Sequence, residues 1–227
     1  MAIQHHLSDE LLLDYATGAL AEGWSIAVAS HLALCPACRR RLHVMEAAGG
    51  ELVADEAVAV EEDEDAWARM SARLASSGHA YDTALAPSPA PDRARHASAP
   101  VSLPEPLRSY LGGDLADLKW KALGRGAFHI PIPVGDGETM VRLLKIPAGK
   151  PVPEHSHGGR ELTLVLEGSF IDGDTLYGRG DVEEADADLT HQPVATAGRD
   201  CICLAVTDAP LKFRSWLLRL VQPMLGI

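Results

Sequence analysis

The chain has 227 residues, a length that suits two compact units of about 80 to 130 residues joined by a linker. Apolar residues make up 47% of it and charged residues 23%, which excludes wholesale disorder and a fibrous repeat. Its 32 acidic and 20 basic side chains give a formal charge of -12, which argues against direct nucleic-acid binding because a phosphate backbone would be repelled, and favours a basic protein partner.

Membrane and disulfide signals are both missing from the sequence. No stretch approaches the ~20 apolar residues that a membrane helix needs, and the N-terminus lacks the basic and then apolar order of a secretion signal. We therefore expect a cytoplasmic protein. Its four cysteines form two close pairs, Cys35 with Cys38 and Cys201 with Cys203, which in a reducing compartment indicate metal or redox positions.

Residues 1–77 show the apolar spacing of helices. Ser8 is a suitable N-cap for a first helix that ends at Gly18. A second helix is expected over residues 22–34, because Pro36 cannot continue it but fits the first position of a new helix.

The third and fourth helices follow directly. The third is expected over residues 36–48 and closed by the pair Gly49-Gly50. An acidic stretch then precedes a fourth helix, one face of which carries Trp67, Met70 and Leu74. Ordinary core packing and contact with a partner protein are equally good explanations of this face.

Beyond residue 77 the composition changes twice. Residues 78–106 are dominated by Ala, Ser and Pro, which cannot bury enough apolar area to offset chain entropy, so they are expected to form a linker. Residues 107–227 then show strand-like runs at 128–134, 138–146, 161–171 and 200–206. The segment 211–225 is ambiguous between a strand and a short helix. The expected fold class is α + β in two domains, a helical domain (1–77) and a small all-β barrel or sandwich (107–227).

Three ligand-type side chains lie close together around the second helix. His31 and Cys35 are four residues apart and share one helix face, and Cys38 follows about one turn later. A tetrahedral Zn²⁺ needs a fourth ligand, which His5 or His6 can supply from the N-terminal arm. We therefore expect a zinc site of two histidines and two cysteines. The alternative, a redox-active dithiol, normally follows a strand, and none is expected before these cysteines.

The β-rich half contains a second pattern of ligand-type residues. Gly149 is followed after five residues by His155 and His157, then after three more by Glu161 and after a further six by Gly168, which is similar to the first motif of cupins. Residues two apart on a strand point to one face, so the two histidines are expected to point together into the barrel.

His191 is the expected fourth ligand, because its separation from Gly180 matches the second cupin motif. The sequence departs from that motif where Asp186, Asp188 and Ala195 replace its usual proline, glycine and asparagine. Three imidazoles and one carboxylate suit Zn, Fe, Mn or Ni. The alternative is a metal-free barrel in which the histidines are hydrogen-bonded core residues.

The HxxxCxxC signature of His31, Cys35 and Cys38, with a histidine near the N-terminus and the cupin pattern downstream, resembles the zinc-binding anti-sigma factors of the ChrR type. The resemblance covers nearly the whole chain except the linker. It implies that the helical domain binds an extracytoplasmic-function sigma factor and blocks its access to RNA polymerase. It also implies that His6 is the fourth N-terminal ligand, that zinc is favoured in the barrel, and that the signal is singlet oxygen or a related oxidant.

The remaining cysteines and histidines give weaker signals. Cys201 and Cys203 share one face of an expected strand, where they are either apolar filler or oxidisable thiols near the barrel metal. Four other histidines have no partner pattern and are expected to be ordinary surface or core residues: His43, His79, His96 and His129.

Two other functions are compatible with these patterns, although we expect no catalysis. The chain could be a metal-dependent cupin enzyme, such as a dioxygenase or isomerase, with an N-terminal zinc-binding regulatory module. In that case Glu183, Glu184 and Arg142 are candidate contributors to acid and base chemistry. The third possibility is a zinc-dependent scaffold that binds some protein other than a sigma factor.

Overall fold

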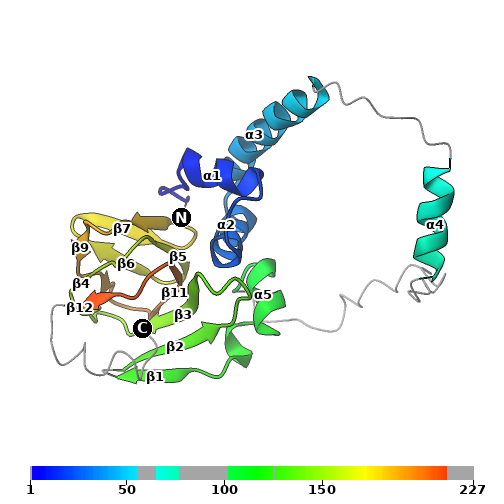
Figure 1. Ribbon diagram of the computed structural model, residues 1–227. Helices are drawn as coiled ribbons and strands as arrows, with labels where there is room; N and C mark the ends of the chain where they lie inside the picture. The colour runs from blue at the N-terminus through cyan, green and yellow to red at the C-terminus, as the bar shows by residue number, and fades with distance from the viewer. Residues whose placement is uncertain (1, 56–64, 77–101, 125, 214–227) are drawn as a thin grey trace. The chain divides into compact units, whose positions relative to one another are not determined.

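The computed structural model describes residues 2–55, 65–76, 102–124 and 126–213 (Figure 1). The chain divides into two compact units, of which one combines residues 1–49 with 101–227 and the other comprises residues 50–100. The predicted linker lies outside the described residues as far as residue 101. Its last two residues begin a short helix, α5 (Glu105–Leu111).

Helices α1 (Asp9–Ala16) and α2 (Glu22–Leu34) confirm the first two predicted helices. The Ser8 hydroxyl accepts a hydrogen bond from the Leu11 backbone N–H at 3.3 Å, as expected of an N-cap. Cys35 is the C-cap of α2, and its N–H donates to the carbonyl of His31 at 2.8 Å. The local sequence therefore fixes the junction that carries three of the predicted ligands.

Helix α3 (Pro36–Asp55) begins at the predicted proline, but its predicted end is wrong. The helix continues through Gly49 and Gly50, neither of which has a positive φ. A glycine in an exposed helix interior costs only about 1 kcal/mol relative to alanine, so it ends a helix only where the chain must turn. Helix α4 (Ala66–Ser76) confirms the fourth predicted helix and has no buried residue.

The β-rich part of the first unit contains a six-stranded antiparallel sheet and two three-stranded sheets. The strands of the large sheet, in the order β1-β2-β3-β11-β5-β8, are β1 (Lys121–Gly124), β2 (Ala127–Ile132), β3 (Met140–Ile146), β11 (Cys201–Thr207), β5 (Glu161–Glu167) and β8 (Val182–Ala185). One small sheet comprises β10 (Val194–Ala195), β6 (Ser169–Asp172) and β7 (Thr175–Gly178), and the other comprises β12 (Lys212–Phe213), β4 (His155–Ser156) and β9 (Thr190–His191).

Four predicted strands are confirmed as β2, β3, β5 with β6, and β11. The run expected over residues 161–171 is broken at Gly168, which has a φ of 71°. A Cβ atom at this position would lie 2.3 Å from the carbonyl oxygen of Asp200, so only glycine lets the two segments approach. This break sends β6 into a different sheet from β5.

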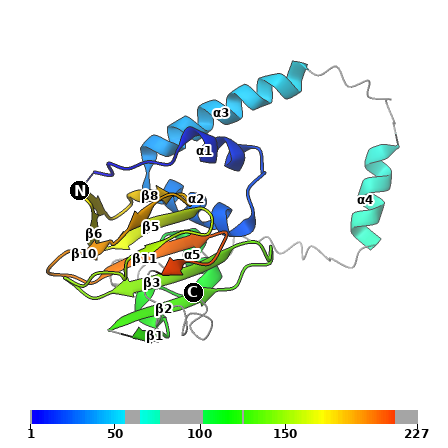
Figure 2. The ribbon, with the colours of Figure 1, turned by 60° about the vertical axis from the view of Figure 1, so that its left-hand side comes forward.

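Two apolar clusters lie on opposite faces of the large sheet. One joins the sheet to α1, α2 and α5 and includes Leu12, Val28, Leu107, Leu164 and Leu204. The other fills the barrel interior and includes Val165, Phe170 and Cys201. Helix α2 contacts β5, β11 and α5, and Figure 2 shows these helices along one side of the sheet. The N-terminal helices therefore share one core with the sheet.

Some predictions fall on residues that the structure leaves undescribed. These are His79, His96, most of the acidic stretch before α4, and the ambiguous C-terminal segment beyond residue 213. Among the described residues, no helix combines the length and apolar character that crossing a membrane requires.

Candidate metal centres

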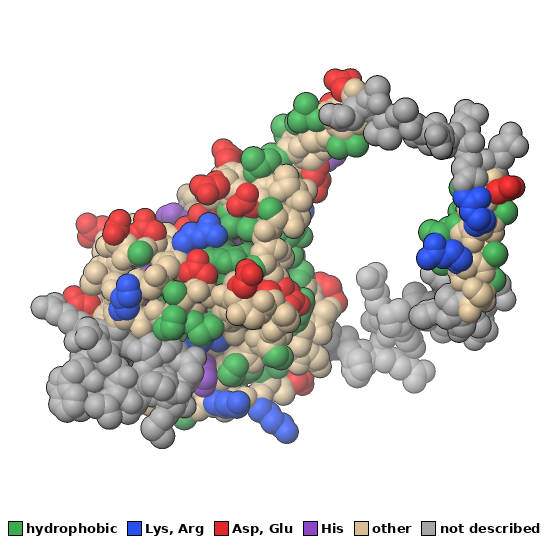
Figure 3. Space-filling model, viewed as in Figure 1, with side chains coloured by type: hydrophobic (Ala, Val, Ile, Leu, Met, Phe, Trp, Pro, Cys, Tyr) green, Lys and Arg blue, Asp and Glu red, His purple; other side chains and the backbone are tan. Residues whose placement is uncertain are grey.

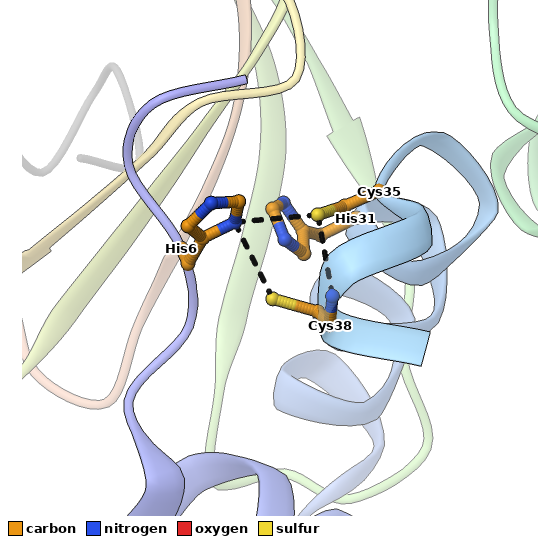
Figure 4. A group of neighbouring side chains, drawn as sticks. All are labelled: His6, His31, Cys35 and Cys38. Carbon is orange, nitrogen blue, oxygen red and sulfur yellow. Dashed lines mark hydrogen bonds between the residues drawn. The ribbon is translucent and has the colours of Figure 1, made fainter. Parts of the chain in front are cut away.

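Four side chains from the N-terminal arm and the junction of α2 with α3 converge on one point. Their ligand atoms all lie within 4.8 Å of one another, and the residues are His6, His31, Cys35 and Cys38. His6 Nδ1 is 3.3 Å from Cys35 Sγ and 3.6 Å from Cys38 Sγ (Figure 4). Standard Zn–S and Zn–N bonds in a tetrahedron separate sulfur from nitrogen by about 3.5 Å. The spacing of the donor atoms therefore suits zinc.

The ring of His31 is completely buried and its two nitrogens have different surroundings. Nδ1 lies 2.9 Å from the carbonyl oxygen of Gly180 and therefore carries the proton of this hydrogen bond. Nε2 is buried and has no hydrogen-bond partner. Burial lowers the pKa of His31 to about 4, so the ring is neutral. A neutral imidazole with a buried, unpaired nitrogen fits a metal ligand.

The two cysteines of this cluster are also buried, and both are free thiols. Cys35 Sγ accepts a hydrogen bond from the Cys38 backbone N–H at 3.4 Å, because the first turn of α3 curls around it. Burial raises the pKa of the Cys38 thiol in the metal-free chain. A bound metal ion would favour the thiolate over the protonated thiol instead, since two thiolates neutralise the charge of Zn²⁺.

His5, the other arm histidine, lies away from this cluster. Its Nδ1 is 3.6 Å from Asp181 Oδ2, and its ring is 4.5 Å from the ring of Tyr177. The geometry thus groups His6 with the helix junction, whereas spacing alone had left the two histidines equivalent.

Three histidines converge in the barrel, as the cupin pattern predicts. His155 and His191 are paired residues of β4 and β9, and His157 follows β4 directly. The Nε2 atom of His191 is 3.1 Å from that of His155 and 3.1 Å from that of His157. The Nδ1 of His155 contacts the carbonyl of Pro153 at 2.8 Å, which turns its Nε2 toward the others. Three inward imidazoles of this kind suit a transition metal.

Glu161 lies beside these histidines but outside the converging group. Its Oε2 is 3.4 Å from His157 Nδ1, and its Oε1 accepts a hydrogen bond from the Thr163 hydroxyl at 3.0 Å. Burial alone would raise its pKa, but the contact with His157 holds the pKa of Glu161 below its usual value. Its role as a metal ligand remains a prediction.

Two carboxylates near His191 form a further group with it. Asp172 Oδ2 lies 2.9 Å from His191 Nδ1, and Glu183 Oε1 lies 3.9 Å from the same nitrogen. Burial and the neighbouring Asp172 raise the pKa of Glu183 to about 8. Asp172 could not be predicted from the sequence because it belongs to no spacing pattern. It reaches His191 of β9 only because β6 pairs with β10, the strand that follows β9.

The barrel cluster borders a small cavity of about 80 Å³ with a largely apolar lining. The lining of this cavity includes His155, Glu161 and both cysteines of the pair Cys201 and Cys203. The sulfur atoms of these two cysteines are 3.5 Å apart. The hydrogen bond between the two thiols, together with burial, raises the pKa of Cys203 well above its usual value. A thiol that stays protonated is a poor nucleophile, which favours the prediction that these cysteines are apolar filler. The two cysteines do, however, lie near the histidines, as the prediction of oxidisable thiols requires.

The described residues contain two other histidines of the predicted set. His129 is buried in β2, and burial lowers its pKa. His43 is exposed on α3. Neither belongs to a group of possible metal ligands in the described part of the chain.

Comparisons with known proteins agree with this architecture. Residues 110–210 match the family described as the ChrR cupin-like domain. The anti-sigma-E factor ChrR of Cereibacter sphaeroides is 46% identical over 227 residues, which is 100% of both chains. ChrR in the crystal structure of Rhodobacter sphaeroides SigE with the anti-sigma ChrR has a TM-score of 0.74 and 42% identity, covering 91% of this chain and 100% of that one. The chain belongs to the ChrR family.

Proposed function

We propose that this chain is an anti-sigma factor that binds and inhibits an extracytoplasmic-function sigma factor. The observation that carries the proposal is the full-length relative, 46% identical, whose name is anti-sigma-E factor ChrR. A structural match to ChrR bound to SigE supports it. The function needs no catalysis. Because the proposed partner acts in the cytoplasm, we place the chain there as well.

The N-terminal cluster is proposed to hold zinc through His6, His31, Cys35 and Cys38. The unpaired buried Nε2 of His31 and the spacing of the donor atoms support this choice. The ion would connect the arm, α2 and α3 through one residue of the arm, one of α2 and the two cysteines of the junction. Binding energies of roughly 10–16 kcal/mol for structural zinc are large compared with the stability of a small helical domain.

Helix α4 is proposed to contact the sigma factor. Its residues Trp67, Met70 and Leu74 are 75%, 51% and 48% exposed, so core packing does not account for this apolar face. Figure 3 shows hydrophobic side chains on α4 beside basic ones. An exposed stripe of this size, with a tryptophan in it, is typical of a protein–protein contact.

The barrel is proposed to sense the signal through a second metal held by His155, His157, Glu161 and His191. Zinc is the preferred ion, and Fe, Mn and Ni also suit three imidazoles. Oxidation at this site, by singlet oxygen or a related oxidant, would alter the barrel and reduce the affinity for the sigma factor. We keep the functional division into a helical domain (1–77), a linker (78–106) and a sensor domain (107–227).

The main test is native mass spectrometry of the full-length chain copurified with its partner. We expect a sigma factor of the extracytoplasmic-function class and at least one zinc ion per chain. A complex with a different protein would favour the scaffold interpretation, and a chain that captures no sigma factor would refute the proposal.

One observation favours the alternative of a cupin enzyme. His155 of the barrel cluster lines a cavity, and Glu183, with its pKa raised to about 8, lines the same cavity and could act as an acid there. The cavity of about 80 Å³ would admit only a very small substrate without rearrangement. Turnover of a small molecule by the metal-loaded chain, with no effect on any sigma factor, would support this alternative.

A further inference from the structure

The turn between β7 and β8 lies directly against the N-terminal metal cluster. Its residue Gly180 accepts the hydrogen bond from His31 Nδ1 at 2.9 Å. Gly180 itself is held in the sheet, since its N–H donates to the carbonyl of Val165 at 2.8 Å. A barrel residue thus sets the orientation of a ring that belongs to α2.

The same turn also holds the arm that carries His6. The Asp181 carboxylate accepts hydrogen bonds from the backbone N–H groups of Gln4 and His5, at 2.6 and 2.9 Å. The Val182 N–H then donates to the carbonyl of His5 at 3.3 Å. Asp181 is only 5% exposed, and its second oxygen accepts the N–H of Gly178 at 2.8 Å. The arm is therefore fixed along the edge strand β8 immediately before His6.

The four predicted ligands divide into two pairs. The two cysteines are positioned by the junction of α2 and α3, as described above. Both histidines, by contrast, depend on atoms of the barrel, one through Gly180 and the other through Asp181. Groups that hydrogen-bond to metal ligands fix the ring and its tautomer, and their removal typically costs about 10- to 100-fold in metal affinity.

We propose that Gly180 and Asp181 are positioning residues for the N-terminal metal site, so that zinc binding and docking of the barrel on the arm strengthen each other. The inference rests on the zinc site proposed above and adds a regulatory connection to it. By linkage, any factor by which barrel docking raises zinc affinity is also the factor by which zinc stabilises the docking.

Strand β8 extends this connection to the barrel cluster. Glu183 points inward, where it lines the cavity and lies 3.9 Å from His191 Nδ1. Glu184, the next residue, accepts a hydrogen bond at 2.8 Å from the backbone N–H of Ser8, the N-cap residue of α1. Neighbouring residues of a strand point to opposite faces, so one short strand contacts the barrel cluster on one face and the residues that flank His6 on the other. A displacement of β8 would therefore change the geometry of His6 and His31.

The test compares two alanine variants of the full-length chain. Asp181→Ala removes the carboxylate that holds the arm. The matched control is Asp136→Ala. Like Asp181, Asp136 caps a barrel turn, and it accepts a hydrogen bond at 3.1 Å from the backbone N–H of Gly23 in the helical part. Gly23 and His31 are eight residues apart on α2, about 12 Å along the helix. The control therefore weakens docking far from the metal cluster.

The readout is zinc affinity, measured by competition with a chromophoric chelator. We expect Asp181→Ala to lower the affinity of the N-terminal site at least tenfold, and Asp136→Ala to change it less than twofold. Equal affinities of Asp181→Ala and the unsubstituted chain would overturn the inference. Circular dichroism checks folding, and Asp181→Asn, for which we expect a smaller loss in the same direction, replaces the alanine variant if that one does not fold.

A second measurement needs no variant. Nitrogen-15 NMR of the zinc-loaded chain should show a slowly exchanging proton on His31 Nδ1 and a metal-bound Nε2. A proton on Nε2 would contradict the role of Gly180. The outcomes also separate the two proposals: a chain that binds no zinc refutes the metal site itself, whereas normal zinc binding by Asp181→Ala refutes only the role of the turn. At saturating zinc, Asp181→Ala should still capture the sigma factor.

Discussion

The two histidine clusters of this chain differ in the atoms that hold them and in the space around them. The N-terminal cluster combines two thiols with two imidazoles, and its cysteines come from one helix junction. The barrel cluster consists of three imidazoles on and beside two short strands and borders a cavity of about 80 Å³. Closed sites that include thiolates are typical of structural zinc, and sites beside a cavity leave room for a reaction. This difference supports the proposed structural role of the first cluster and the proposed responsive role of the second.

Cys38→Ser tests this assignment with the largest expected effect. The substitution removes one thiolate from the N-terminal cluster, so the chain should lose one zinc ion and its capture of the sigma factor. Metal content and pull-down measure both on the same sample. Cys203→Ser, a change of the same kind in the barrel, should keep the N-terminal zinc and the capture. Full capture by a zinc-free Cys38→Ser chain would remove the distinction between the clusters.

His157→Ala tests the other half of the comparison. The variant should bind the sigma factor as the unsubstituted chain does, because the N-terminal cluster is intact, but it should fail to release the sigma factor under oxidative stress. A transcriptional reporter in cells exposed to light and a photosensitiser measures the release. Normal induction in this variant would show that the barrel cluster is not the sensor.

Trp67→Ala tests whether α4 contacts the partner. Removing an exposed aromatic residue from an interface should weaken binding by about 2 kcal/mol, or roughly 30-fold, without loss of zinc. Val44→Ala on α3 is the control, since Val44 is also exposed, at 68%. Titration calorimetry with the purified sigma factor would give both affinities, and equal values for the two variants would contradict a special role of α4.

The last prediction concerns the pH dependence of stability. In the metal-free folded chain burial lowers the pKa of His31 to about 4, whereas the unfolded chain binds this proton near 6.5. The unfolded state therefore gains protons first, and stability should fall as the pH decreases from 6.5 to 4, by on the order of 3 kcal/mol. Thermal unfolding at several pH values measures this. His31→Gln should flatten the dependence, and His43→Gln, at an exposed position, should not.

Much of this molecule follows from local sequence. The cap at Ser8, the proline that starts α3 and the histidines around β4 are short-range patterns, and the structure contains each of them. The end of α3 was not predictable from Gly49 and Gly50, because a glycine pair is tolerated in an exposed helix.

The contacts between distant segments were not predictable. Asp172 reaches His191, and Gly180 reaches His31, across separations of 19 and 149 residues. Neither contact follows from a spacing, since each depends on how the sheets and helices pack. The short strands β7, β8 and β10 were not predicted either, because each has too few residues to show an alternation of apolar and polar side chains.

The central claim is that the N-terminal zinc site maintains the shape that captures the sigma factor. The direct test removes zinc from the full-length chain stepwise with a chelator, and measures zinc content and sigma capture on each sample. We predict that capture falls in proportion to the occupancy of the N-terminal site and returns when zinc is added back. Undiminished capture by a chain shown to be free of metal would contradict the claim.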